Sequence, residues 1–166
     1  MTAQFRDTLK YKGQQYSLAT EPLSPYLEAM DIQYPGTSTA NYRGYIASWE
    51  VSEDKLFLIN VNIPSFTTEK AGSAKLFPDQ EKTFANWFTG SIRVPHGELL
   101  EYMHQGYGSL YEKEFYLRFL NGELVGKSRK NNRPEYEKRL ALRRQIEEAN
   151  ENKKSTKNRL WSIFTK

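Results

Sequence analysis

The chain contains no cysteine and only two histidines, His96 and His104. The lack of cysteine excludes disulfides, iron–sulfur clusters, thiolate-held metals and a cysteine nucleophile. The two histidines stand in no HExxH or HxH spacing, and no paired-aspartate pattern accompanies them. We therefore expect no metal site and no cofactor.

Long apolar runs are also missing. No uncharged apolar stretch approaches the roughly 18–20 residues that cross a bilayer, and the first residues, MTAQFRDTLKYKG, lack the apolar core of a signal peptide. The sequence thus predicts a protein of the cytoplasm without a transmembrane segment.

The familiar catalytic motifs are absent as well. The sequence has no GxxxxGK[ST] or GxGxxG phosphate loop and no GxSxG nucleophile elbow. The one local group with titratable and aromatic members is Glu101, Tyr102, His104 and Tyr107, which would form the centre of a small enzyme. Charged residues near turns are usually only solvated, so we favour a protein that is not an enzyme.

What the chain does have is aromatic content, with 14% Phe, Trp and Tyr in 166 residues. Large rings can supply much of a single core. The predicted class is α+β, with antiparallel β-hairpins in one sheet or a half-open sandwich, a short helix in the N-terminal half and a long C-terminal helix. We expect a β-rich domain over 1–130, a helix over 131–150 packed on it, and a basic linker with an apolar end over 151–166.

Alternating apolar residues separated by turn formers predict four hairpins. They lie over residues 8–19 with a turn at Gly13, 42–63 with a turn at SEDK, 91–103 with Gly97 in the turn, and 114–127 with a turn at Asn121–Gly122. Asn-Gly is the dipeptide that a type I′ hairpin turn favours. A short helix is expected over 22–30, and loops over 33–41, 64–83 and 104–111, while FANWF suits a helical turn or a strand. Tyr45 and Trp49 alternate as core residues do.

The C-terminal region changes character at Asn131. Asn131 and Asn132 can cap a helix, and Pro134 suits its first turn. Apolar residues from Tyr136 to Ile146 cover a broad half of the helix, which favours packing on the sheet over a coiled-coil seam. The run ENKKSTKN indicates a linker, and RLWSIF could dock on the protein's own core, on a second copy in a homodimer, or at a membrane interface.

Charge divides the chain unevenly. Residues 127–166 carry 13 basic and 5 acidic side chains, whereas residues 1–126 carry 11 and 15. A basic tail is typical of either a solvated helix or a nucleic-acid contact. The nucleic-acid alternative would use Arg139, Arg143, Arg144, Lys153, Lys154, Lys157 and Arg159.

The segments NYRGYIASWEVSEDKLFLINV and WFTGSIRVPHGELLEYMHQGYGSLYEKEFYLRF are similar to a set of small uncharacterised bacterial proteins. In that set RGY, WE and KL precede WFTG and a later GY, and the similarity covers about residues 8–126. It implies a bacterial origin, in a mobile element or beside a toxin, and assigns no catalytic residue.

Tyrosine, tryptophan and arginine are enriched in binding hot spots, and several lie in or near the expected loops. The candidates for contact with a partner are Tyr42, Arg43, Tyr107 and Tyr111. The sequence therefore favours a non-enzymatic protein-binding domain, such as an immunity or antitoxin-like inhibitor of another protein.

Overall fold

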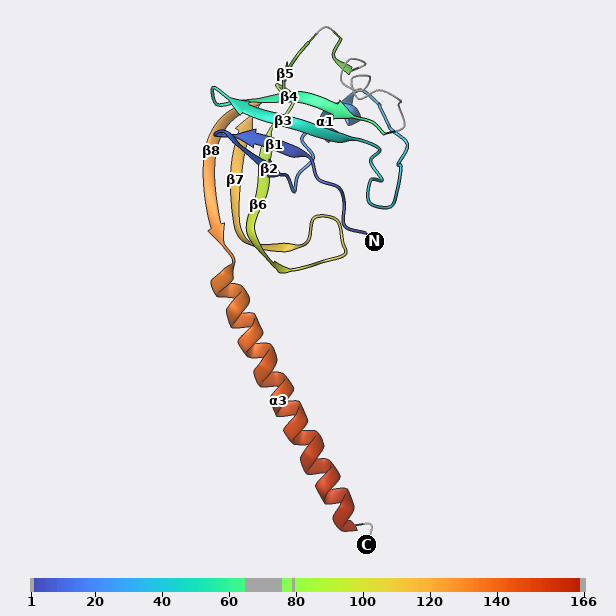
Figure 1. Ribbon diagram of the computed structural model, residues 1–166, viewed down its shortest axis with the longest axis vertical. Coiled ribbons are helices and arrows are strands. Elements are labelled where there is room, and N and C mark those ends of the chain that lie inside the picture. The colour runs from blue at the N-terminus through green and yellow to red at the C-terminus, as the bar shows by residue number, and fades with distance from the viewer. Residues whose placement is uncertain (1, 65–75, 79, 165–166) are drawn as a thin grey trace. The chain divides into compact units, whose positions relative to one another are not determined.

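A computed structural model describes residues 2–64, 76–78 and 80–164, with the backbone alone at residues 155 and 157–164. The chain forms two compact units, Met1–Asn131 and Asn132–Lys166. The first unit contains the strands and a short helix, and the second contains a long helix (Figure 1). The α+β class predicted from the sequence is confirmed.

Three of the four predicted hairpins are confirmed. They are β1 (Thr8–Tyr11) with β2 (Gln14–Ser17), β3 (Ile46–Ser52) with β4 (Lys55–Asn62), and β7 (Leu110–Leu120) with β8 (Glu123–Asn131). Each has a two-residue turn with positive φ at both positions: Lys12 and Gly13, Glu53 and Asp54, and Asn121 and Gly122. Positive φ at both positions is the geometry that follows the right-handed twist of the paired strands.

The hairpin predicted around Gly97 is wrong. Residues Gly90–Glu101 form one long strand, β6, which pairs with β7 along its length. Gly97, with a φ of 80°, lies where the register shifts between His96 and Leu99. A glycine at positive φ can form a bulge inside a strand as well as a turn between strands. Local sequence does not separate the two cases, and the presence of β7 alongside decides for the bulge.

The remaining short elements follow the sequence closely. Helix α1 (Ser24–Ala29) lies within the predicted range 22–30 and has a proline in its first turn. β5 (Thr83–Phe84) is a two-residue strand that pairs with β4, so FANWF begins as a strand and then turns. The predicted connection 64–83 lies partly outside the described residues.

The strands form one sheet in the order β2-β1-β3-β4-β8-β7-β6. All pairs are antiparallel except β1 with β3. The sheet folds over so that β1–β4 face β6–β8 (Figure 1), and the Ala19 N–H donates to the Arg93 carbonyl at 2.9 Å where β2 approaches β6. The rings of Tyr16 and Phe115 contact each other between the two halves, with centroids 5.0 Å apart.

The core lies between these halves. Its most deeply buried large side chains are Trp49, Phe119, Leu9, Leu18, Leu23, Leu56, Ile92 and Leu117. Tyr45 is also buried, as the alternation Tyr45–Ala47–Trp49 predicts. A closed core of this kind leaves the connecting loops at the ends of the strands as the variable surface of the unit.

The second unit is helix α3 (Arg133–Phe164), 32 residues long. It continues through ENKKSTKN, so the predicted linker after residue 150 is wrong. This run contains neither glycine nor proline, and its three lysines and one glutamate favour a helix despite their polarity. That α3 packs on the first unit, and that the terminal segment docks or dimerises, stay predictions. Among the described residues, no helix combines the length and apolar character required to cross a membrane.

Candidate functional site

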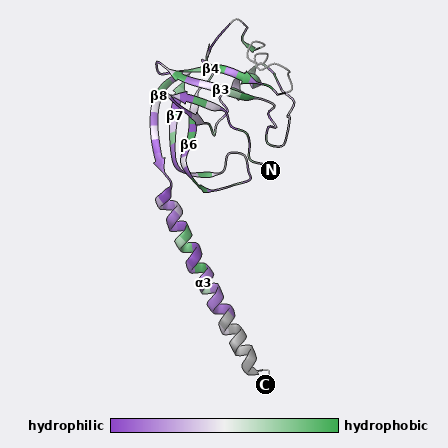
Figure 2. Ribbon diagram, viewed as in Figure 1, coloured by the Kyte–Doolittle hydropathy of each residue, from purple (hydrophilic) through white to green (hydrophobic). Residues whose placement is uncertain are grey.

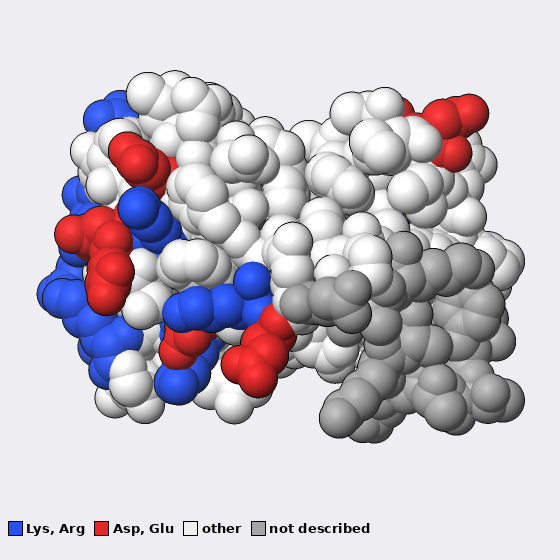
Figure 3. All heavy atoms as spheres, turned by 90° about the horizontal axis from the view of Figure 1, so that it is seen from above, with Lys and Arg blue, Asp and Glu red and all other residues white. Residues whose placement is uncertain are grey.

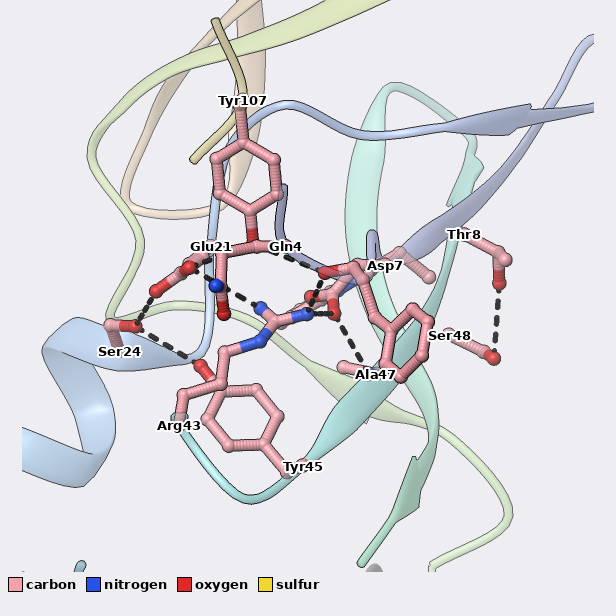
Figure 4. Close-up of polar contacts among 12 residues, drawn as sticks. Gln4, Asp7, Thr8, Glu21, Ser24, Arg43, Tyr45, Ala47, Ser48 and Tyr107 are labelled. Atoms are coloured by element: carbon pink, nitrogen blue, oxygen red, sulfur yellow. Dashed lines mark hydrogen bonds and ion pairs between the residues drawn. The ribbon is translucent and has the colours of Figure 1, made fainter. Parts of the chain in front are cut away.

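A buried carboxylate organises the loop end of the first unit. Asp7, directly before β1, is only 1% exposed. It accepts hydrogen bonds from Arg43 Nη2 at 2.6 Å, the Ala47 N–H at 2.9 Å and Trp49 Nε1 at 3.0 Å. Burial raises the pKa of Asp7, and the charge of Arg43 and these hydrogen bonds oppose the rise. The carboxylate thus holds the start of β3 against the start of β1 (Figure 4).

Arg43 lies on the loop before β3 and is itself buried. Its Nη2 also donates to the Phe5 carbonyl at 3.1 Å, and its guanidinium lies 4.6 Å from the centre of the Tyr45 ring. Burial acts to lower the pKa of Arg43, but the attraction of Asp7, aided by Tyr107, Tyr45 and Glu21, outweighs burial and raises it. Arg43 therefore remains a cation inside the protein, where it joins two loops.

Tyr107 brings a third loop to this centre. Its hydroxyl donates to Glu21 Oε1 at 2.8 Å, with the Phe5 carbonyl 3.3 Å away. Glu21 Oε2 accepts from the Ser24 hydroxyl at 3.1 Å, and that hydroxyl lies 3.0 Å from the Tyr45 hydroxyl (Figure 4). Burial raises the pKa of Tyr107, and burial raises that of Tyr45 to about 12. Both phenols are therefore protonated at neutral pH and act as hydrogen-bond donors or acceptors, not as bases.

A second ion pair adjoins the first. Glu114, 3% exposed, accepts from Arg93 Nη2 at 2.6 Å and Nε at 3.1 Å, and from the Tyr116 hydroxyl at 2.6 Å. Arg93 Nη1 also donates to the Tyr107 carbonyl at 3.3 Å. Tyr107 is thus held at its hydroxyl by Glu21 and at its backbone by Arg93. The two ion pairs and Tyr107 make one connected polar network through the loop end.

This network joins loops that carry four exposed large side chains, Phe5, Tyr42, Tyr102 and Met103, which we together call the loop platform. Their side chains are 54%, 67%, 54% and 45% exposed. The segments that carry them lie side by side, because the Gln4 N–H donates to the Gly106 carbonyl at 3.1 Å and the Phe5 N–H to the Ala40 carbonyl at 2.8 Å. These loops therefore present large side chains to solvent while hydrogen bonds hold their backbones together.

The four residues predicted to contact a partner have different positions. Tyr42 is exposed on the loop platform. Arg43 and Tyr107 belong to the polar network, where their side chains hold loops together, and their contact with a partner stays a prediction. Tyr111 is half-buried, with the guanidinium of Arg6 5.1 Å from its ring centre.

The residues of the enzyme alternative are partly brought together. Tyr102 and His104 are exposed, and their rings meet edge to face at 4.6 Å. Tyr107 directs its hydroxyl to Glu21, and Glu101 ends β6. In the described part of the chain, no group of three or more His, Cys, Asp or Glu side chains could hold a metal ion.

The residues of the nucleic-acid alternative lie on α3. Arg139, Arg143, Arg144, Lys153 and Lys154 are exposed, while the side chains of Lys157 and Arg159 lie outside the described residues. On the face of the molecule in Figure 3, basic and acidic side chains gather together at one side, and a broad area beside them carries no charge.

Sequence reasoning missed Asp7, Glu21 and Phe5. Asp7 is separated from Arg43 by 36 residues and Glu21 from Tyr107 by 86, and neither carboxylate belongs to a motif. One local signal existed, since a charged residue directly before an alternating strand must be either solvated or paired.

Comparison of the chain with protein-family models, with curated proteins and with solved structures finds no match.

Proposed function

We propose that this protein is a non-enzymatic binding module whose first unit recognises a partner protein through the loop platform. The observation that supports this proposal is the combination of exposed rings and a buried ionic network on the same set of loops. Phe5, Tyr42 and Tyr102 are each more than half exposed. Asp7 and Arg43 join the segments that carry Phe5 and Tyr42, and Tyr107 ties the loop that follows Tyr102 to Glu21.

Exposed aromatic side chains on fixed loops suit protein recognition for two reasons. Tyrosine and other large side chains bury much area in an interface and can be amphipathic, so they often act as hot spots. Loops that are already ordered lose less conformational entropy when they bind, so the affinity for the partner is higher. The titratable groups of the network are all engaged in internal hydrogen bonds, which favours a supporting role over acid–base chemistry.

An inhibitor-like role, of the immunity or antitoxin kind, is the form of protein binding that the sequence favours. Inhibitors that occupy another protein's functional site commonly keep their interface backbone nearly unchanged on binding. Loops held together by buried ion pairs favour the same behaviour. The expected partner is therefore a folded protein with an apolar, uncharged recess that accepts two or three rings.

The test is a quantitative capture from nuclease-treated lysate of the native host, followed by reconstitution with the purified partner. The intact protein is compared with the platform variant Phe5→Ser/Tyr42→Ser/Tyr102→Ser. The matched control is Leu120→Ser/Val125→Ser, which removes two side chains that are 54% and 50% exposed at the β7–β8 end. Circular dichroism and urea titration establish that all three proteins are folded.

Binding of a purified partner that falls about a hundredfold or more in the platform variant, and remains in the control, would support the proposal. A partner bound equally by the platform variant would refute it. Retention of nucleic acid in place of a protein, lost at high salt, would refute it as well.

A further inference from the structure

Helix α3 carries a seven-residue repeat in its described part. Leu142, Ile146 and Ala149 follow one another at spacings of four and three residues, and the same spacing reaches Arg139 before them and Lys153 after them. Seven residues make about two helical turns, so these five side chains form one stripe, which we call the α3 seam. In the sequence alone, Leu160 and Ile163 continue the spacing.

The centre of the α3 seam is apolar and exposed. Leu142 and Ile146 are 57% and 52% exposed, although both are large aliphatic side chains. Figure 2 shows such short hydrophobic bands interrupting an otherwise hydrophilic helix. The apolar surface of this 32-residue helix also includes Tyr136 and Leu140, which lie off the seam, but Leu142, Ile146 and Ala149 have the spacing of a coiled-coil strand.

Charges are sorted around the α3 seam. The positions that flank it hold basic or uncharged residues, namely Tyr136, Lys138, Arg143, Gln145, Asn150 and Asn152. The outward positions of the helix hold the acidic residues Glu137, Glu147, Glu148 and Glu151. Among residues 133–154, Glu135 is the one acidic residue with the spacing of the seam, and it lies in the first helical turn, where the macrodipole favours a negative charge.

We propose that the α3 seam binds a helix of another protein, one that carries acidic residues beside its own apolar stripe, in a two-stranded heteromeric coiled coil. Flanking charges set partner choice in coiled coils, and basic flanks select acidic ones. Parallel pairing of two copies of α3 would place Lys138 of one copy against Arg143 of the other. It would also place Arg139 beside Arg139 and Lys153 beside Lys153 in the seam, so parallel self-pairing is disfavoured.

A helical partner explains more of the seam than a nucleic acid does. Phosphates would pair with Arg139, Arg143 and Lys153 but would leave Leu142 and Ile146 in water. Burial of these two side chains against another helix removes apolar area from solvent, which is the main driving force of such pairing. Arg144 has the same side chain as Arg143 but lies at an outward position among glutamates. We therefore expect Arg144 to contribute nothing to the binding of the partner helix.

The test uses the full-length protein and a synthetic acidic peptide of four heptads. The peptide has isoleucine and leucine in its stripe, glutamate at both flanks, and aspartate opposite Arg139 and Lys153. A second peptide has lysine at both flanks, and a labelled 20-base-pair DNA duplex is the nucleic-acid probe. Affinity is measured by fluorescence anisotropy at two salt concentrations, and stoichiometry by sedimentation equilibrium.

Two matched pairs of variants locate the contact. Arg143→Glu changes a flank of the seam, and Arg144→Glu makes the same change one residue away at an outward position. Leu142→Ser/Ile146→Ser removes the apolar centre, and Leu140→Ser removes a leucine that lies off the seam. Helicity of every variant is checked by circular dichroism, so that loss of binding is separated from loss of the helix.

We expect a one-to-one complex with the acidic peptide and no complex with the lysine peptide. Arg143→Glu should weaken it about tenfold, and Leu142→Ser/Ile146→Ser about a hundredfold or more. Arg144→Glu and Leu140→Ser should change affinity by less than about twofold. Equal effects of Arg143→Glu and Arg144→Glu, binding of DNA in place of the peptide, self-association through α3, or failure to bind the acidic peptide would each overturn the proposal.

This inference is independent of the loop platform. The platform variant Phe5→Ser/Tyr42→Ser/Tyr102→Ser should bind the acidic peptide with unchanged affinity, and the seam variants should leave platform binding unchanged. Failure of one proposal is therefore distinguishable from failure of the other.

Discussion

Arg43 and Asp7 form a 2.6 Å ion pair in which both side chains are almost completely buried. The two residues are separated by 36 positions, and their contact joins the segment before β1 to the loop before β3. Each charge replaces part of the hydration that the other loses on folding. A buried pair of this kind contributes little net stability by itself, but loss of one partner leaves an uncompensated charge.

Replacement of one member of this pair should be strongly destabilising. We expect Arg43→Met to lower the free energy of unfolding by about 3–5 kcal/mol, because Asp7 is then left buried without its cation. Urea unfolding followed by tryptophan fluorescence measures the change, since Trp49 donates to Asp7. The control is Lys10→Met, in an ion pair with Glu50 whose lysine is 65% exposed, where a change of about 1 kcal/mol or less is expected. Equal losses in both variants would contradict the assigned role of Arg43.

Two turn glycines with nearly the same backbone geometry should respond differently to alanine. Gly13 and Gly122 have φ angles of 77° and 78°. A Cβ on Gly122 would lie 2.6 Å from the Ala85 carbonyl oxygen, whereas a Cβ on Gly13 meets nothing within 4 Å. Gly13→Ala should therefore cost about 1 kcal/mol from backbone strain alone, and Gly122→Ala should cost clearly more. Thermal unfolding of the two variants gives the difference, and equal melting temperatures would argue against close packing at Ala85.

The Glu114 ion pair should make stability fall in acid. Burial alone would raise the pKa of Glu114, but hydrogen bonds from Tyr116 and Arg93 and the charges of Arg93 and Lys130 lower it below the usual value of 4.5. A depressed carboxyl pKa stabilises the folded state above the unfolded-state pKa, and this contribution is lost as the pH falls through the folded-state value. In Glu114→Gln, unfolding measured from pH 7 to pH 2 should show a weaker loss of stability below about pH 4.5. If the stability of Glu114→Gln fell below pH 4.5 as steeply as that of the unaltered protein, the contribution of Glu114 would be refuted.

Tyr107→Phe should loosen the loop that contains residue 107. The variant loses the hydrogen bond to Glu21 but keeps the ring, so global stability should fall by only about 1 kcal/mol. Hydrogen exchange of the backbone amides in 102–109 should accelerate, and binding through the loop platform should weaken with it. The control is Tyr16→Phe, which removes an exposed hydrogen bond to Gln14 and should leave this loop unchanged. Unchanged exchange in 102–109 would mean that Tyr107 does not hold the loop.

Local sequence was informative wherever neighbouring residues decide the backbone. Asn121–Gly122 predicted its hairpin because few residues other than these adopt both turn conformations easily. The same reasoning failed at Gly97, where a glycine at positive φ forms a bulge and a partner strand far along the chain keeps the ladder continuous. It failed again after residue 150, where polarity suggested a linker but no residue breaks the helix.

The sequence by itself determined the elements of this protein: its α+β class, three of its hairpins, the burial of Tyr45 and Trp49, and the basic character of its C-terminal helix. These properties depend on periodicity, turn chemistry and charge over a few neighbouring residues. Only the tertiary structure decided that Arg43 and Tyr107 support a surface while Tyr42 forms part of it. Arg43 is held inside the protein by Asp7, and Tyr107 is held by Glu21. Each carboxylate is far from its partner in the sequence, so no pattern of neighbouring residues indicates the contact.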